Sequence, residues 1–315
     1  MSSEFAHKSV LFDETIEGLI CKKGGKYLDC TTGGAGHSSE ILKKIGPEGF
    51  IYCFDRDIEA INAAQKVLDK VAKNYQLIKA NYVDLDKIAE EYKIQELDGI
   101  LLDLGVSSPQ LDKAERGFSF SKEAPLDMRF SQDESETPKA SDLVNTLGKE
   151  ELVKIFSEYG EEPYSKTIAD AIVQSRKKTP ILTTTQLSEV IIKSLEGKKY
   201  KGSIHPATRV FQALRIAVND ELKGVEKVIP KALKVLKKGG RLAIISFHSL
   251  EDRIVKNSLK DIVKECICPP RQPICNCNKK SEAKIITKKP IIAKDSEIKE
   301  NPRARSAKLR ILEKI

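Results

Sequence analysis

An alternation of short apolar runs with amphipathic helical patterns constrains the fold of this chain more than any other feature. Strand-like runs occupy residues 26–30, 50–54, 75–79 and 98–105, and helical periodicity lies between successive runs. The fourth run is apolar on both faces, as expected for a buried parallel strand. This rhythm predicts an α/β fold built on a parallel sheet.

The rhythm stops after the fourth run, and the next strand of the same character is 241–247. A crossover between parallel strands needs only a helix and two loops, so most of this gap must be an insertion. Three apolar stripes at helical spacing lie within it. We therefore expect a helical domain at 113–205, inserted into a discontinuous domain formed by 1–112 and 206–315.

The C-terminal part of the chain continues the pattern less regularly. Gly239 and Gly240 are expected to end a helix, and the lysine-rich stretch 278–300 is expected to be loop-like. The elements predicted here are helices at 206–222 and 225–236 and strands at 283–288 and 306–312.

Positive charge is concentrated in this same part of the chain. Residues 254–315 hold 16 Lys or Arg against 7 Asp or Glu, whereas the other residues hold 38 against 39. This asymmetry favours a polyanionic partner, with a solvated lysine-rich surface as the alternative.

Composition excludes several classes of protein. With 40% hydrophobic residues the chain is not disordered, and none of its apolar runs is long enough to cross a membrane. Residues 1–19 lack the basic start and apolar core of a secretion signal, so a cytoplasmic location is expected. The seven cysteines are neither even in number nor dense, which argues against a disulfide framework.

A glycine-rich turn, Gly33-Gly34-Ala35-Gly36, follows the first strand, and Asp55 ends the second. Such a turn lets backbone N–H groups approach a ligand, and a carboxylate at the position of Asp55 can bind ribose hydroxyls. A dinucleotide site would need a third glycine where Ser39 stands, so that match is weak. An S-adenosylmethionine site needs only one nucleoside and a charged methionine tail, which the upstream Asp29 suits.

The fourth strand ends in Asp103, and Gln110 follows in the next loop. Ligands of open α/β sheets bind beyond the carboxyl ends of the strands, which places both side chains near the cofactor. Methylation of a pyrimidine ring carbon usually requires a cysteine nucleophile, and residues 103–110 contain none. Transfer to an exocyclic amine requires only alignment of the reactants, so it is the favoured chemistry.

Many further segments of the chain carry a family resemblance. These segments are His7-Lys-Ser-Val-Leu, Gly33-Gly-Ala-Gly-His37, Asp55-Arg-Asp57, Leu101-Leu-Asp-Leu-Gly-Val-Ser-Ser-Pro-Gln-Leu-Asp112, Glu115-Arg-Gly-Phe-Ser-Phe120, Pro125-Leu-Asp-Met-Arg129, His205-Pro-Ala-Thr-Arg-Val-Phe-Gln212, Ile245-Ser-Phe-His-Ser-Leu-Glu-Asp-Arg253 and Asn301-Pro-Arg-Ala-Arg-Ser306. Through them the sequence resembles the MraW/RsmH family, bacterial S-adenosylmethionine-dependent methyltransferases that act on cytosine N4 in small-subunit ribosomal RNA. The resemblance covers nearly the whole chain.

The resemblance implies a class I methyltransferase fold, a Rossmann-like sheet with an inserted helical domain that recognises RNA. It implies S-adenosylmethionine as cofactor, and small-subunit ribosomal RNA or the assembled small subunit as partner. It also implies a role for each matching residue: Ala35, Gly36 and His37 in the cofactor loop, Asp55 on the ribose, Tyr82 beside the adenosyl group, and Asp103 and Gln110 as cofactor contacts, with Asp103 also catalytic.

Other interpretations stay open at this stage. The chain could methylate DNA cytosine or another exocyclic amine, could be an RNA-binding assembly factor with a vestigial pocket, or could be a nicotinamide oxidoreductase. His37 and His248 could be structural histidines rather than site residues. The arginines that could contact RNA phosphate are Arg116, Arg129, Arg209, Arg215, Arg303 and Arg305.

Four cysteines, Cys266, Cys268, Cys275 and Cys277, form two C-x-C pairs. Tetrahedral metal sites usually have two to four residues between such ligands, and the prolines between these pairs restrict closure. A reduced structural loop is therefore favoured over a metal or redox site, and no metal ligand is assigned.

Overall fold

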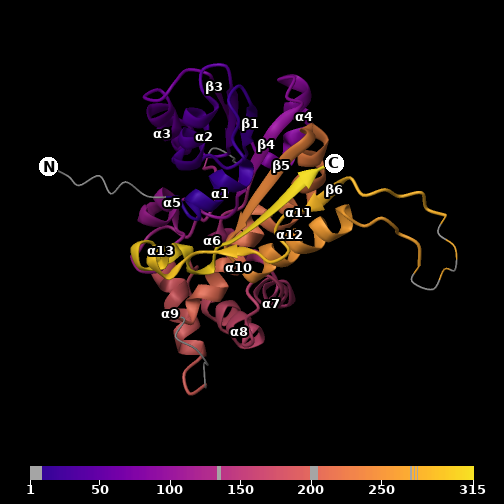
Figure 1. The fold of residues 1–315 in the computed structure, drawn as a ribbon. Coiled ribbons are helices and arrows are strands. Elements are labelled where there is room, and N and C mark those ends of the chain that lie inside the picture. The colour runs from indigo at the N-terminus through magenta and orange to yellow at the C-terminus, as the bar shows by residue number, and fades with distance from the viewer. Residues whose placement is uncertain (1–8, 133–135, 199–204, 270–271, 273, 275) are drawn as a thin grey trace. The chain divides into compact units, whose positions relative to one another are not determined.

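The chain forms two compact units in a computed structural model that describes all residues except 1–8, 133–135, 199–204, 270–271, 273 and 275. One unit combines Met1–Gly105 with Leu222–Ile315, and the other is Val106–Glu221 (Figure 1). The predicted inserted segment, 113–205, lies within this second unit. Among the described residues, no helix has the length and apolar character that crossing a bilayer demands.

A mixed sheet forms the centre of the first unit, with strand order β3-β2-β1-β4-β5-β8-β6 and β7 paired to β8. Strands β1 to β5 are mutually parallel, whereas β8 runs antiparallel to β5, β6 and β7. The α/β fold class predicted from the sequence is thereby confirmed. The strands are β1 (Lys26–Asp29), β2 (Phe50–Asp55), β3 (Tyr75–Lys79), β4 (Leu97–Asp103), β5 (Leu236–Ser246), β6 (Ala283–Ile285), β7 (Ile291–Ile292) and β8 (Lys308–Lys314).

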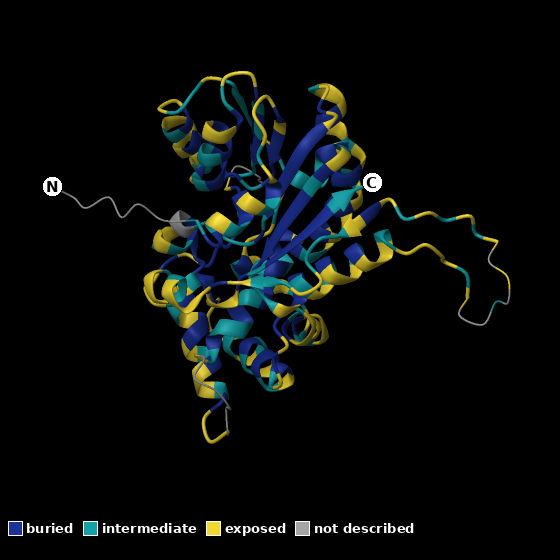
Figure 2. Cartoon of the chain, viewed as in Figure 1, coloured by how far each residue is buried: buried dark blue, intermediate teal, exposed yellow. Residues whose placement is uncertain are grey.

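Both faces of this sheet are covered by helices, so its central strands are buried throughout (Figure 2). Alternate residues of β4 divide between two apolar cores: Ile100 and Leu102 enter the core that contains α4, α11 and α12, whereas Leu101 enters the core that contains α1, α2 and α3. The accompanying helices are α1 (Phe12–Leu19), α2 (Gly36–Ile45), α3 (Ile58–Leu68), η1 (Tyr82–Asp84), α4 (Leu85–Glu91), α11 (Glu221–Val235), α12 (Ser249–Ile262), α13 (Asp295–Glu300) and η3 (Pro302–Ser306).

The second unit is helical and has an apolar core of its own. The three stripes seen in the sequence are confirmed as interior faces, since Phe156, Ile172 and Leu187 are fully buried in it. Its helices are α5 (Ser108–Asp112), η2 (Ala114–Arg116), α6 (Ala140–Thr146), α7 (Lys149–Glu158), α8 (Ser165–Arg176), α9 (Thr184–Ser194) and α10 (Ala207–Asn219).

Two expectations for the C-terminal part were wrong. Gly239 and Gly240 do not end a helix but lie inside β5, because α11 already ends at Val235. The stretch 278–300 is not simply loop-like, since it contains β6, β7 and α13. The predicted strands at 283–288 and 306–312 are confirmed in part by β6 and β8. The short strand β7 depends on its pairing with β8, a tertiary contact that local sequence patterns do not reveal.

Gly99 allows β4 to pass close to a buried aromatic ring. It pairs in register with Tyr27 of β1, and a Cβ at residue 99 would lie 2.8 Å from the Tyr27 ring and 3.1 Å from Leu19. The ring cannot easily move away, because its hydroxyl accepts a hydrogen bond from the Lys22 N–H at 3.0 Å and donates one to the Ile20 carbonyl at 3.2 Å. Residue 99 therefore has room only for glycine.

We predict that Gly99→Ala lowers the free energy of unfolding of the sheet unit by about 1–3 kcal/mol, the usual cost of overpacking a core. Gly34→Ala is the matched control, since a Cβ there meets no atom within 4 Å. Urea unfolding followed by circular dichroism measures both variants. Equal stability of the two variants would show that the Tyr27 contact does not require glycine.

Candidate active site

Three carboxylates end three neighbouring strands at one edge of the sheet. Asp29 is the last residue of β1, Asp55 of β2 and Asp103 of β4. The chain builds outward from β1 to β3 on one side and from β4 to β5 on the other, so the strand order reverses between β1 and β4. The carboxyl edge at such a switch point is where open α/β sheets bind ligands.

The loop after β1 leads into the uncapped N-terminus of α2. Ala35 takes the N-cap position with a left-handed φ of 61° and provides no side-chain cap, so the first amides of α2 lack a side-chain acceptor. The side of Gly34 is open, with no atom within 4 Å of where a Cβ would stand. Exposed amides at a helix N-terminus are suited to bind a carboxylate or another anion.

Gly36 is required for a reason that the sequence did not suggest. A Cβ at this position would overlap the side chain of Ser9, so it is the N-terminal segment that demands glycine here. The same segment places the ring of Phe12 parallel to His37, with centroids 5.8 Å apart. His7 and Lys8, from the same sequence motif, lie outside the described residues.

The carboxylates of Asp29 and Asp55 hold the loop in place. Asp29 accepts hydrogen bonds from the Thr31 N–H at 3.0 Å and the Ser38 hydroxyl at 2.5 Å. Asp55 accepts from the Gly33 N–H at 2.8 Å and the Asp57 N–H at 2.9 Å, one on each oxygen. Each oxygen of Asp55 retains a second lone pair, so this carboxylate can also accept hydrogen bonds from ribose hydroxyls.

Asp103 faces His37 across the start of α2. Its Oδ2 lies 3.6 Å from His37 Nδ1, and its backbone N–H donates to Thr31 Oγ1 at 2.6 Å. The Asp103 side chain is 24% exposed, yet its Oδ1 is inaccessible and makes no hydrogen bond, and neither does His37 Nε2. Buried polar atoms without partners are rare in native proteins, so these two atoms are candidates for contact with a ligand.

Burial shifts the protonation of all these groups toward their neutral forms. It raises the pKa of Asp29 and of Asp55 to about 6, and it raises the pKa of Asp103 well above the ordinary value, with the Asp29 charge adding to this effect. Burial also lowers the pKa of His37 to about 4, against a backbone hydrogen bond with Val10, so its imidazole is neutral at pH 7.

In the part of the chain that the structure describes, no lysine or arginine forms an ion pair with Asp29, Asp55 or Asp103. Several buried carboxylates without a counter-ion favour a ligand that brings positive charge and hydrogen-bond donors. A sulfonium, an ammonium group and ribose hydroxyls meet these requirements. The doubly charged pyrophosphate of a dinucleotide would be repelled by the same carboxylates, which adds to the argument from Ser39.

Glu251 is a member of this edge that the sequence reasoning did not identify. It is buried at the start of α12, accepts a hydrogen bond from the Phe247 N–H at 2.8 Å, and its charge contributes to the raised pKa of Asp103. His248 is the N-cap of α12, and its Nε2 lies 3.1 Å from Glu251 Oε1. The sequence did contain a pattern that could have placed Glu251 at the start of α12. An N-cap residue, His248, is followed three positions later by glutamate, as in a capping box.

The remaining predicted contacts are Tyr82, which follows β3 at the same edge of the sheet, and Gln110, which belongs to the second unit. Tyr82 begins η1 just after β3 and packs near α11, where a Cβ on Gly224 would be 3.2 Å from its hydroxyl. Gln110 belongs to the second unit, where it is buried and its Oε1 accepts the Ser107 N–H at 3.0 Å. Cofactor contact by Tyr82 and by Gln110 stays a prediction.

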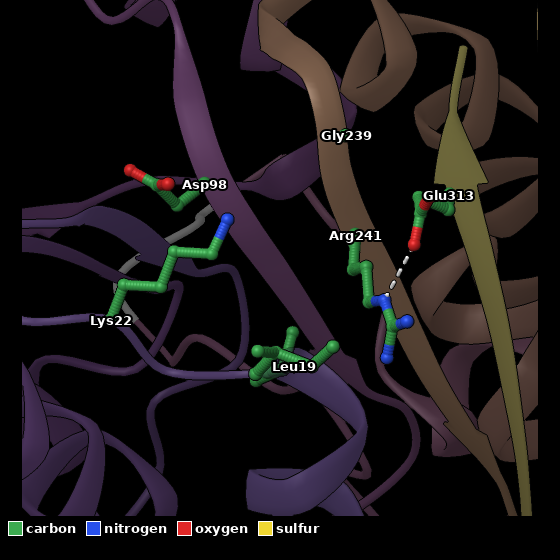
Figure 3. A pocket seen from close by; sticks show the side chains of 7 residues that line it. Leu19, Lys22, Asp98, Gly239, Arg241 and Glu313 are labelled. Atoms are coloured by element: carbon green, nitrogen blue, oxygen red, sulfur yellow. Dashed lines mark hydrogen bonds and ion pairs between the residues drawn. The ribbon is translucent and has the colours of Figure 1, made fainter.

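A cavity of about 240 Å³ lies at the opposite, amino edge of the parallel strands (Figure 3). Charged side chains of both signs line it, including Lys22 and Asp98, and Arg241 Nε contacts Glu313 Oε2 at 3.0 Å within it. The acids of this cavity form ion pairs, Asp98 with Lys237 and Glu313 with Arg241. The acids that end β1, β2 and β4 form no ion pair with a described lysine or arginine. The cavity is therefore separate from the candidate active site.

Three of the six arginines proposed for phosphate contact are engaged inside the second unit. Arg116 donates to the carbonyls of Arg129 and Phe130, at 3.2 and 2.8 Å. Arg129 and Arg215 each make two hydrogen bonds to one carboxylate, that of Asp127 and that of Glu221 respectively. These three guanidinium groups hold local structure, whereas Arg305 in η3 is exposed.

Comparison with known proteins agrees with this geometry. The sequence profile of the MraW methylase family matches residues 4–315. A protein named ribosomal RNA small subunit methyltransferase H from Clostridioides difficile (strain 630) is 49% identical over 312 residues, which cover 99% of this chain and 100% of that protein. The protein of the same name from Geobacter sp. (strain M21) is 50% identical, with 99% of each chain covered.

Among solved structures, one described as a putative rRNA-methylase from Clostridium thermocellum is similar over 99% of this chain and 100% of that chain, at 12% identity and a TM-score of 0.45. That likeness is too distant to support an argument, whereas the profile and the sequence relatives cover the chain almost completely. The family expected from the motifs is thereby confirmed: the chain belongs to the MraW methylase family.

Proposed function

We propose that the chain transfers a methyl group from S-adenosylmethionine to the exocyclic N4 of a specific cytidine in small-subunit (16S) ribosomal RNA. Family membership supports methyl transfer, and the names of the relatives support the class of RNA. The observation that carries the choice of an amine is Asp103, whose buried Oδ1 has no hydrogen-bond partner at the switch point of the sheet.

S-adenosylmethionine is the methyl donor, and the carboxyl edge of the sheet fits it in charge and in hydrogen bonding. When bound, it supplies a methyl group on a cationic sulfur that needs no further activation. We assign the ribose hydroxyls to Asp55 and the methionine carboxylate to the amides of Gly36 and His37 at the start of α2. Asp29 and Asp103 supply the negative charge that a sulfonium and an ammonium group require.

Asp103 acts on the substrate amine. Its carboxylate accepts a hydrogen bond from an N4–H, which holds the amino group so that the nitrogen lone pair, perpendicular to the ring plane, faces the methyl donor. When bound, S-adenosylmethionine would supply the methyl group: the nitrogen–carbon bond would form as the carbon–sulfur bond breaks, with the electron pair left on sulfur. The alkylated amine then loses its extra proton, which Asp103 is placed to accept because its pKa is raised. Alignment of the two reactants is the main source of rate, since it can contribute about 7–11 kcal/mol.

We assign recognition of the RNA to the helical unit, Val106–Glu221, and to the basic C-terminal part of the chain. The cytidine must leave its stack to reach the carboxyl edge, which costs a few kcal/mol and least when the base is unpaired. With Arg116, Arg129 and Arg215 engaged internally, exposed Arg305 and the C-terminal lysines become the better candidates for phosphate contact. The cytoplasm is the compartment that this substrate requires.

The other interpretations weaken for separate reasons. An oxidoreductase would place pyrophosphate beside these carboxylates. An assembly factor with a vestigial pocket would not need to keep three acids whose pKa values burial raises, at a cost in stability. DNA cytosine or a different amine remains the second candidate substrate, because Asp103 would serve it equally well.

We predict that Asp103→Asn lowers the single-turnover rate of methyl transfer at least about 100-fold, the lower bound for loss of a proton acceptor. The assay uses small subunits that lack the modification, and N4-methylcytidine is quantified after nuclease digestion. Asp69→Asn is the control, as an exposed aspartate that pairs with Lys73 on the surface. A normal rate in Asp103→Asn with normal cofactor affinity would remove both roles assigned to Asp103.

Cofactor affinity should fall with acid. The carboxylate form of Asp55 is the one that accepts ribose hydroxyls, and its pKa in the free protein is raised to about 6. At pH 5 most of this group is protonated, so we expect the affinity for S-adenosylmethionine to be about tenfold lower than at pH 7.5, and to level off above pH 7. Protonation of Asp29, with a similar pKa, acts in the same direction.

Calorimetry at both pH values measures this change. The Asp55→Asn variant should bind more weakly at pH 7.5 and show a smaller pH dependence, since residue 55 no longer titrates. Binding that is equal or tighter at pH 5 in the wild-type protein would contradict the assignment of these carboxylates.

A further inference from the structure

The segment between α12 and β6 is a long excursion without helices or strands among its described residues (Figure 1). Its apolar side chains are not buried, since Ile267 is 65% exposed and Ile274 is 78% exposed. Loops of this length inside a compact domain usually have a function of their own or a bound group that orders them. Among the described residues of this segment, none is buried in an apolar core that could order it.

The two ends of this loop are closed at one residue of α12. Lys264 Nζ lies 2.5 Å from Asp261 Oδ1, and Lys279 Nζ donates to the Asp261 carbonyl at 2.8 Å. This closure brings the first C-x-C pair, Cys266 and Cys268, near Cys277 of the second. The first pair and Cys277 therefore meet even though prolines lie between them in the sequence.

The three sulfur atoms have the spacing of metal ligands. All three lie within 4.8 Å of one another, and Cys266 Sγ is 3.8 Å from Cys277 Sγ. Zinc–sulfur bonds of about 2.3 Å in a tetrahedron place two sulfurs about 3.8 Å apart. The sulfur of a disulfide partner would instead lie at about 2.05 Å.

Backbone amides point at two of these sulfurs. The Ile267 N–H donates to Cys277 Sγ at 3.4 Å, and the Cys268 N–H donates to Cys266 Sγ at 3.3 Å. Such hydrogen bonds stabilise the thiolate form and are the usual outer support of a metal–thiolate centre. Lys264 and Lys279 stand two residues from Cys266 and Cys277 in the sequence, so positive charge adjoins the cluster along the chain.

We propose that Cys266, Cys268 and Cys277 bind a structural zinc ion that orders the loop between α12 and β6. Thiolate ligands select zinc over magnesium or calcium, and a site ringed by protein sulfur suits a structural ion rather than a catalytic one. A fourth cysteine of the tract, Cys275, lies outside the described residues, and the proposal does not depend on it. The zinc has no part in methyl transfer, so it is independent of the proposed function.

Metal analysis of the full-length protein tests this proposal directly. The protein is purified without a histidine tag, exposed to zinc, passed over a chelating resin and analysed by mass spectrometry for zinc. We expect about one zinc per chain in the wild type, and a drop of at least about fivefold in Cys266→Ser and Cys277→Ser. Cys21→Ser is the control, because Cys21 is a cysteine near the start of the chain, far in sequence from the cluster. The zinc content of this variant should equal that of the wild type.

Two further measurements guard against trivial loss of metal through misfolding. Circular dichroism and S-adenosylmethionine binding should be unchanged in Cys266→Ser, since the loop is remote in sequence from Asp55 and Asp103. Cobalt added to the metal-free protein should give the intense visible bands of tetrahedral thiolate coordination, and these should be absent in Cys266→Ser. Four results would overturn the proposal. The wild-type protein could contain no zinc, it could contain iron instead of zinc, both serine variants could retain zinc, or two of these cysteines could form a disulfide.

Discussion

Three acids end β1, β2 and β4 at the carboxyl edge of the sheet, and none of them forms an ion pair with a lysine or arginine among the described residues. This concentration of negative charge is the constraint on which the account rests. Ionised Asp29, Asp55 and Asp103 destabilise the free protein at neutral pH, because burial raises the pKa of each. Backbone amides and hydroxyls stabilise Asp29 and Asp55 in part, and Asp103 Oδ1 has no such partner. A ligand that carries positive charge and hydroxyl donors relieves this cost. Charge and hydrogen bonding alone therefore make the site favour such ligands, whatever the shape of the pocket.

The sheet supplies the rigidity that holds these charges together. Its strands are buried on both faces, and the reversal of strand order between β1 and β4 brings Asp29 and Asp103 to adjacent strand ends. Close packing such as that of Gly99 against Tyr27 fixes the register of these two strands. The positions of Asp29 and Asp103 thus depend on core packing at the other end of their strands.

Much of this arrangement could be predicted from sequence. Strand ends mark Asp55 and Asp103, because a buried strand has a clear apolar pattern and ligands bind at its carboxyl end. The left-handed backbone of Ala35 and the cover of Ser9 over Gly36 could not, since both depend on tertiary contact. Charge alone suggests phosphate contact for Arg129 and Arg215, yet each pairs with an acid only two or six residues away, Asp127 and Glu221 respectively. The sequence shows that these acids are close but not that they form the ion pairs. A strand was predicted at 283–288, where β6 forms, whereas β7 was missed because pairing with β8, not local propensity, creates it.

A crystal structure of the protein with S-adenosylmethionine bound tests the central claim most directly. The account predicts ribose hydroxyls on Asp55, the methionine carboxylate on the first amides of α2, and the sulfonium methyl group directed toward Asp103 Oδ1. A cofactor bound at another edge of the sheet, or a carboxyl edge filled by protein side chains in the complex, would contradict it.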